Sequence, residues 1–211
     1  MIGAGGHAAS LTETIHALGL TLKLVVDPNS SAESDFRGIA TAKTVPDTSL
    51  RGTESFVIAV GDNYTRKSLR DTLLRGVPTE RLAILIHPSA SVSTTASIAH
   101  GSVVLQNAVI GTSARLEEGC IVNSGAIVEH ECVLHAYSSL GPGSTLGGRT
   151  RIGGRSAVSI GATVAHGLDI GNDTIVGASA YVHRDLPDRV VAYGIPATVR
   201  RSRAPSDRYL G

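Results

Sequence analysis

The sequence has very few aromatic residues and few cysteines. Among 211 residues there are five tyrosines, two phenylalanines, no tryptophan and two cysteines. Hydrophobic residues still make up 42% of the chain, which is enough to bury a real core and to form two small domains. Any such core must be filled mainly by aliphatic side chains.

The chain also lacks an excess of charge and a long apolar run. Nineteen Lys and Arg residues face eighteen Asp and Glu residues, for a formal net charge of +1. Without a basic surface or an aromatic-plus-basic stripe, we expect no nucleic-acid partner. No apolar run approaches the ~20 residues of a membrane span, and the first residues lack the pattern of a signal peptide. We therefore expect a cytoplasmic protein with no membrane span.

A six-residue repeat runs without a break from Ile86 to Pro187. The first position is aliphatic in all seventeen hexads, and the residue four positions later is small in fifteen, with Leu168 and Leu186 as the exceptions. A fixed short period of this kind predicts a solenoid, here a left-handed parallel β-helix with three hexads in each coil. Residues eighteen apart then stack directly, with the aliphatic side chains inside.

The two cysteines, Cys120 and Cys132, both occupy the small position of their hexads. Small apolar positions inside a repeat are buried, where a free thiol behaves as a small hydrophobic group. Neither cysteine is therefore expected to act as a nucleophile.

The first 85 residues have a different pattern, which predicts a half-Rossmann domain of the βαβ type. Residues 3–8 fit the G-x-G-x-x-G/A phosphate fingerprint and lead into an amphipathic helix, and an apolar strand over 22–26 ends in Asp27. Further segments predict a strand over 55–60, a helix over 65–75 and a short strand over 82–86. We expect three parts: a Rossmann-like domain (1–85), a β-helix (86–187) and a C-terminal segment (188–211).

The glycine fingerprint allows two interpretations. Open backbone N–H groups at the start of a helix can bind a phosphate, and Asp27 can accept a hydrogen bond from a ribose or base. Equally, many glycine-rich turns between a strand and a helix bind nothing. A nicotinamide cofactor is disfavoured because the second mononucleotide half is missing. Since only Met1 and Ile2 precede Gly3, the opening strand is expected to be very short or clipped.

His130 is the histidine best placed for chemistry. It occupies a corner of the expected β-helix, where a side chain points outward, and the adjacent Glu131 can hold the imidazole in one tautomer. Gly148 lies one coil later in the same column, so its backbone N–H could approach a reacting oxygen. The alternative is an ordinary solvated histidine, which is also the better interpretation of His166.

Several separated motifs together resemble one known family. They are residues 3–7 (Gly-Ala-Gly-Gly-His), 59–63 (Ala-Val-Gly-Asp-Asn) with Arg66, 87–90 (His-Pro-Ser-Ala), 121–132 and 194–197 (Gly-Ile-Pro-Ala). In this order they resemble the sialic-acid O-acetyltransferase and nucleotide-amino-sugar N-acetyltransferase family of hexapeptide-repeat acyltransferases, also known as NeuD/PglD-like. The match covers nearly the whole chain.

The resemblance implies a homotrimer whose active sites lie between subunits and which uses acetyl-CoA and a nucleotide-linked amino sugar, with no metal. It implies His130 as general base and Glu131 as its orienting partner. The substrate-binding residues that it implies are Gly5, Gly6, His7, Asp27, Gly61, Arg66 and Asn123. The residues that it implies at the acetyl-CoA groove are Ser139, Gly148, Ile160 and Ala178. Many members carry a second histidine where this chain has Ser139, so one contact to the thioester or sugar is altered.

The expected reaction is direct N-acetylation of the 4-amino group of a nucleotide-linked 4-amino-4,6-dideoxy sugar, in surface-glycan or glycoprotein sugar biosynthesis. O-acetylation of a sialic-acid-type sugar and a non-catalytic nucleotide-sugar-binding role stay open as alternatives. A β-helix metalloenzyme of the carbonic-anhydrase type is disfavoured, because His130 and His135 would need a third histidine where the chain has Thr94.

Overall fold

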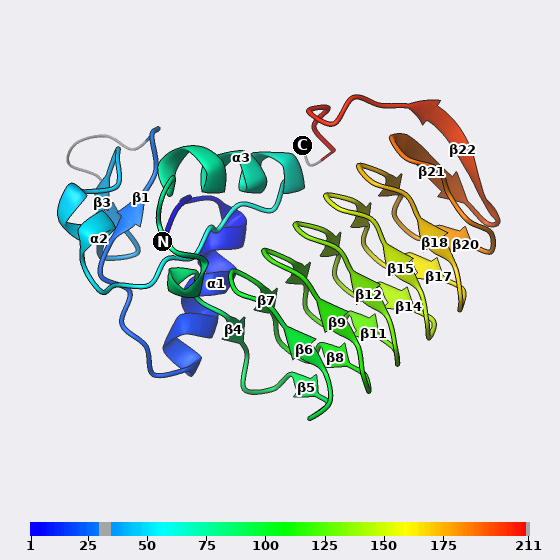
Figure 1. The fold of residues 1–211 in the computed structure, drawn as a ribbon, viewed down its shortest axis with the longest axis horizontal. Helices are drawn as coiled ribbons and strands as arrows, with labels where there is room; N and C mark the ends of the chain where they lie inside the picture. Colours follow the sequence, from blue (N-terminus) through cyan, green and yellow to red (C-terminus); the bar gives the residue numbers. More distant parts are fainter. Residues whose placement is uncertain (30–34, 210–211) are drawn as a thin grey trace.

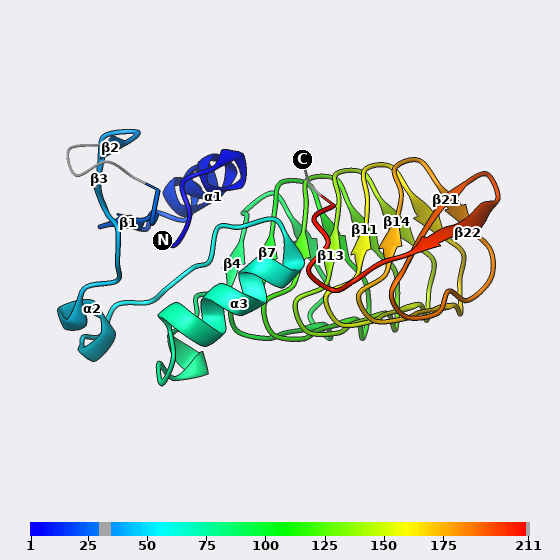
Figure 2. The ribbon, with the colours of Figure 1, turned by 90° about the horizontal axis from the view of Figure 1, so that it is seen from above.

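The computed structural model describes residues 1–29 and 35–209. It has a small N-terminal α/β part and a long stack of short parallel strands (Figure 1). The two parts lie against each other along one side of the stack, as the view from above shows (Figure 2). This architecture confirms the predicted Rossmann-like domain followed by a hexapeptide-type β-helix.

The N-terminal part is a narrow sheet with helices on both faces; its strands are parallel except β2, which pairs antiparallel with β3. Its helices are α1 (Gly6–Ala17), α2 (Asp47–Arg51), α3 (Asn63–Leu73) and the 3-10 turn η1 (Thr79–Arg81), and its strands are β1 (Val25–Val26), β2 (Asp35–Phe36) and β3 (Ile39–Ala42). Single bridged residues extend the sheet: Ile2 pairs with both Val26 and Ile58, and Phe56 pairs with Leu82. The opening strand is thus reduced to Ile2, and the expected strand over 55–60 makes only two bridges.

The sequence patterns predicted α1, β1 and α3, but they did not predict β2, β3 and α2. The helix expected over 65–75 begins two residues earlier because the Asp62 carboxylate accepts a hydrogen bond from the Thr65 N–H at 2.8 Å. Segments β2 and β3 are short and partly exposed, so they lack the regular apolar alternation that reveals a strand in a sequence.

The β-helix has three flat faces. Face 1 contains β4 (Leu85–Ile86), β7 (Val103–Val104), β10 (Ile121–Val122), β13 (Ser139–Leu140), β16 (Ala157–Val158), β19 (Ile175–Val176), β21 (Val190–Gly194) and β22 (Ala197–Ser202). Face 2 contains β5 (Ser91–Val92), β8 (Val109–Ile110), β11 (Ile127–Val128), β14 (Thr145–Leu146), β17 (Thr163–Val164) and β20 (Tyr181–Val182). Face 3 contains β6 (Ser97–Ile98), β9 (Arg115–Leu116), β12 (Val133–Leu134), β15 (Arg151–Ile152) and β18 (Asp169–Ile170).

The register between coils is eighteen residues on every face up to β20, and it shortens to sixteen where β21 pairs with β19. Ile127, for example, pairs with Val109 below and Thr145 above. The second residue of each two-residue strand from β4 to β20 points inward, and from Val104 onward these side chains form one buried cluster together with Cys120 and Cys132. At the C-terminal end β21 continues the stack in parallel with β19, and β22 folds back antiparallel on β21.

The outward columns differ between the faces. On face 1, Leu85, Val103 and Ile121 are buried against α1 of the N-terminal part. Face 3 presents a column with charges: Ser97, Arg115, Val133, Arg151 and Asp169. Face 2 presents an uncharged column: Ser91, Val109, Ile127, Thr145, Thr163 and Tyr181. The N-terminal part therefore covers face 1 and leaves an uncharged face 2 open.

Arg66 on α3 ties the two parts together. Its side chain is fully buried, and all five of its N–H groups have protein acceptors. Two are carbonyl oxygens of the β-helix, those of Gly119 and Tyr137, each at 2.9 Å. The others are the carbonyl oxygens of Val60 and Gly61, each at 3.0 Å, and the Asn63 side chain at 2.7 Å.

We expect Arg66→Met to lower the free energy of unfolding by about 2–5 kcal/mol, because the buried carbonyl groups lose their donors while the apolar volume is nearly kept. Urea unfolding measures this change. Arg75→Met, at an exposed position just after the same helix, is the control. If Arg66→Met lowers the free energy of unfolding by less than about 1 kcal/mol, the hydrogen bonds of Arg66 contribute little to stability.

Candidate active site

His130 and Glu131 form a pair at the corner between faces 2 and 3. His130 Nδ1 lies 3.0 Å from Glu131 Oε2, and both side chains are about half exposed. A carboxylate only accepts hydrogen bonds, so the pair places the imidazole proton on Nδ1 and leaves Nε2 free to accept one. Glu131 has φ +59°, and its N–H donates to the Thr112 carbonyl at 2.8 Å, which holds the corner in shape.

Gly148 provides the space in which the imidazole lies. A Cβ atom at Gly148 would stand only 2.3 Å from His130 Nε2 and 2.5 Å from its Cε1, so any side chain there would collide with the ring. Among the described residues, none accepts a hydrogen bond from the Gly148 N–H. The corner thus combines an oriented base with a free backbone donor one coil away, which suits a reaction that moves a proton and develops negative charge on oxygen.

Asn123, expected near the sugar, and two of the residues expected at the acetyl-CoA groove, Ile160 and Ala178, lie at a different corner, between faces 1 and 2. Asn123 is held there by its own side chain, whose Nδ2 donates to the Leu140 carbonyl at 2.8 Å. Ile160, which is 61% exposed, and Ala178 stack eighteen residues apart in the same column. Face 2 therefore separates these residues from His130 and Gly148 within one chain.

The glycine-rich turn lies at the carboxyl edge of the N-terminal sheet. Gly3 has φ +103°, and a Cβ there would press on the Ala59 carbonyl oxygen and the Val60 side chain at 3.0 Å. At Gly5 and Gly6, by contrast, nothing lies within 4 Å of an added Cβ, so the start of α1 is open. Its unpaired N–H groups can receive an anion there.

Asp27 and His7 flank this turn. Asp27 accepts hydrogen bonds from the N–H groups of Ala4 at 3.0 Å and Asn29 at 2.9 Å, so its carboxylate braces the turn. Burial, aided by the nearby Arg66 charge, lowers the pKa of His7 to about 4, which keeps the imidazole neutral at pH 7. His7 Nε2 is buried and has no partner among the described residues.

The resemblance implies that Arg66 and Ser139 bind ligands, and in this structure both side chains contact other residues of the protein. Every N–H of Arg66 is engaged within the protein, so its geometry in this structure is that of a tie rather than an open ligand contact. Ser139 is buried on face 1, where its Oγ lies 3.5 Å from Tyr209 Oη. Gly61 offers its carbonyl oxygen to both Arg66 and Tyr209.

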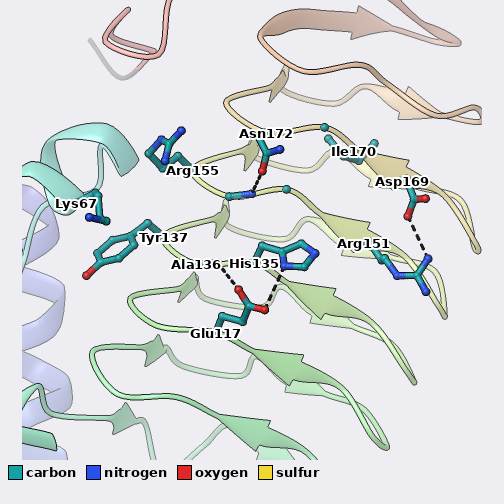
Figure 3. A pocket seen from close by; sticks show the side chains of 13 residues that line it. Lys67, Glu117, His135, Ala136, Tyr137, Arg151, Arg155, Asp169, Ile170 and Asn172 are labelled. Atoms are coloured by element: carbon teal, nitrogen blue, oxygen red, sulfur yellow. Dashed lines mark hydrogen bonds and ion pairs between the residues drawn. The ribbon is translucent and has the colours of Figure 1, made fainter. Parts of the chain in front are cut away.

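A second histidine–carboxylate pair, which the sequence analysis did not single out, lines a cleft of about 510 Å³ at the corner between faces 3 and 1 (Figure 3). His135 Nδ1 lies 3.2 Å from Glu117 Oε1, and Glu117 Oε2 accepts from the Ala136 N–H at 3.0 Å. The sequence did contain a sign of this pair: Glu117 and His135 are eighteen residues apart, which places them one above the other in the β-helix. This pair and His130 stand at opposite ends of β12.

No group of three or more His, Cys, Asp or Glu side chains in residues 1–29 and 35–209 is arranged to hold a metal ion. No described helix has the length and apolarity needed to cross a membrane.

Known proteins match both parts of the chain. Residues 1–73 match the family model of the PglD N-terminal domain. UDP-N-acetylbacillosamine N-acetyltransferase from Bacillus subtilis is 36% identical over 109 residues, so the alignment spans 50% of this chain and 50% of that relative.

Two solved structures match over nearly the full length. A histidine-to-alanine variant of GDP-perosamine N-acetyltransferase from Caulobacter crescentus, in complex with CoA and GDP-perosamine, is 35% identical with a TM-score of 0.86 and covers 95% of each chain. The acetyltransferase domain of PglB from Neisseria gonorrhoeae, in complex with acetyl coenzyme A, is 33% identical with a TM-score of 0.84, covering 94% of this chain and 97% of that one.

The fold and these matches together define a hexapeptide-repeat acyltransferase with a PglD-type N-terminal domain. The chain belongs to the nucleotide-amino-sugar N-acetyltransferase family, which confirms the resemblance found in its motifs.

We expect Gly148→Ala to displace the His130 ring, because the added methyl group would occupy the space of Nε2. The His130 ring signals in an NMR spectrum measure this displacement. Gly154→Ala is the matched control, since six residues further on an added Cβ has only ordinary contacts at 3.4 Å. Unchanged His130 signals in Gly148→Ala would contradict the stacked geometry.

Proposed function

We propose that the protein transfers the acetyl group of acetyl-CoA to the 4-amino group of a nucleotide-linked 4-amino-4,6-dideoxy sugar, a step of surface-glycan or glycoprotein sugar biosynthesis. The observation that carries this proposal is the His130 imidazole, oriented by Glu131 and stacked on the side-chain-free corner at Gly148. The relatives solved with CoA, acetyl-CoA or GDP-perosamine support the choice of donor and acceptor.

The proposed chemistry is direct transfer. The amine nitrogen attacks the thioester carbonyl carbon while His130 Nε2 accepts the proton that nitrogen loses, and the Gly148 N–H donates to the developing oxyanion. The amide C–N bond forms in this attack. Collapse of the tetrahedral intermediate then re-forms the carbonyl group and breaks the C–S bond, and His130 returns its proton to the CoA thiolate. Glu131 keeps Nδ1 protonated throughout, so the base always presents the same nitrogen.

The acceptor is proposed to bind through its nucleotide in the N-terminal part. The open start of α1 at Gly5 and Gly6 would receive phosphate oxygens, with His7 and Asp27 beside the turn. Asn123 would face the sugar. The pantetheine arm of acetyl-CoA would pass Ile160 and Ala178, both exposed at the corner between faces 1 and 2, on its way to Gly148 of another subunit.

Such a site needs two chains. The N-terminal part packs on face 1, whereas His130 lies at the corner between faces 2 and 3. Face 2 lies between the two sets of site residues and is free of charge along its outward column, with Val109 37% and Tyr181 41% exposed. If face 2 of one subunit meets the next around a threefold axis, the two corners come together and the ring closes. We therefore propose a homotrimer with three shared active sites.

We expect His130→Ala to lower kcat/KM by about 10²–10⁴ and to leave acetyl-CoA binding nearly unchanged, because the side chain acts on the proton of the acceptor. The assay follows thiol release from acetyl-CoA with UDP-, GDP- and dTDP-linked 4-amino-4,6-dideoxy sugars. His135→Ala is the matched control, since it removes the other half-exposed histidine paired with a carboxylate.

Each outcome of this assay has a distinct meaning. Wild-type turnover by His130→Ala would show that another group is the base. Acetylation of a sialic-acid-type hydroxyl acceptor in place of every amino sugar would favour the O-acetyltransferase alternative. Nucleotide-sugar binding without any thiol release would indicate a non-catalytic binding protein.

We expect light scattering to report about three times 21.7 kDa for the wild type. Ile127→Lys should lower this mass and the activity together, because it places a charge in the middle of the uncharged face 2 column. Val133→Lys is the control: the same change at the equivalent outward position of the next strand, on face 3, should alter neither. A stable monomer with full activity would contradict the shared-site proposal.

A further inference from the structure

The C-terminal tail returns from the far end of the β-helix toward the N-terminal part. After β22 the described part of the chain runs back beside the stack toward α3 (Figures 1 and 2). Arg203 anchors this segment: its buried guanidinium donates to the Asp173 carbonyl at 2.6 Å and to the carbonyl oxygens of Pro205 and Asp207 at 3.2 and 2.5 Å. The tail is thus fixed to the β-helix before it reaches α3.

The hydroxyl group of Tyr209 in the tail lies at the junction between the N-terminal part and the β-helix. Tyr209 Oη donates to the Gly61 carbonyl oxygen at 3.2 Å. Because its single proton is used there, the Ser139 hydroxyl at 3.5 Å is the donor of the second contact. Burial raises the pKa of Tyr209, so the hydroxyl stays a donor at neutral pH.

Gly61 belongs to the edge of the sheet at which the nucleotide is proposed to bind. It directly follows Ala59 and Val60, the residues that a Cβ added at Gly3 of the glycine-rich turn would contact. Ligands of parallel α/β sheets bind outside the carboxyl ends of the strands. The carbonyl oxygen that Tyr209 holds also accepts a hydrogen bond from Arg66, whose charge acts on His7 in the first turn of α1. This oxygen is therefore connected to the start of α1 through Arg66.

We infer that Tyr209 is a positioning residue for the acceptor: its hydroxyl fixes the Gly61 loop and so shapes the pocket for the nucleoside diphosphate of the sugar. This inference rests on the proposed function. We expect an effect on the acceptor side alone. Ser139, which the resemblance implies at the acetyl-CoA groove, is buried on face 1 in this structure, and the other Tyr209 contact is to Gly61 in the N-terminal part. Both contacts lie away from His130 and Gly148.

The test is Tyr209→Phe, which removes the hydroxyl and keeps the ring. Loss of one hydrogen bond corresponds to a change of roughly 2- to 10-fold. We expect this rise in KM for the nucleotide sugar and in Kd for free UDP or GDP, measured by calorimetry, with kcat and the KM for acetyl-CoA unchanged. Tyr64→Phe, at an exposed tyrosine on α3, is the matched control and should change neither the KM for the nucleotide sugar nor the Kd for UDP or GDP.

The outcomes distinguish a failure of the positioning role of Tyr209 from a failure of the proposed function. If wild-type protein binds UDP or GDP and Tyr209→Phe binds it equally well, the positioning role is overturned and the proposed function stands. An equal change in the KM for acetyl-CoA would also overturn it, since that indicates a general structural effect. If the wild type neither binds these nucleotides nor acetylates a nucleotide sugar, the proposed function fails and the inference fails with it.

Discussion

The eighteen-residue register of the β-helix is the constraint on which the rest of the structure depends. Parallel backbone hydrogen bonds hold each strand about 4.8 Å from the next, so side chains eighteen residues apart stand directly above one another. Inside, this stacks the aliphatic residues into one core. Outside, it places His130 against Gly148 and His135 against Glu117. The same register thus produces both the stability and the chemistry of the corners.

The N-terminal part gains a fixed position through polar contacts as well as apolar packing. Apolar residues of α1 cover face 1, but an apolar surface tolerates small rotations. The Arg66 guanidinium and Asn63 side chain instead bond to carbonyl oxygens of three successive corners: those of Gly119, of Tyr137, and of Arg155 with Ser156. Directional bonds to buried acceptors specify one orientation. The orientation of the glycine-rich turn relative to the β-helix follows from this network.

The residues at the corners of the β-helix could be predicted from the sequence more fully than the residues at the junction between the two parts. His130, Glu131 and Gly148 could be placed because an unbroken period assigns each residue to a corner or a face. Arg66 belonged to a recognised motif, but nothing in the sequence indicated its partners in the β-helix, the carbonyl groups of Gly119 and Tyr137, which lie 53 and 71 residues further along the chain. The role of Tyr209 had no signal at all, since a single tyrosine in a C-terminal segment has no period and its contact to Gly61 spans 148 residues.

The sequence by itself determined the β-helix, its inward residues and the column in which each outward residue lies, because these follow from local periodicity and the geometry of parallel strands. Only the tertiary structure decided which face the N-terminal part covers, that face 2 stays open, and that the tail returns to Gly61. Those features depend on contacts between segments with no common period. They arise from the complementary shapes and hydrogen-bonding groups of surfaces that form only after each part has folded.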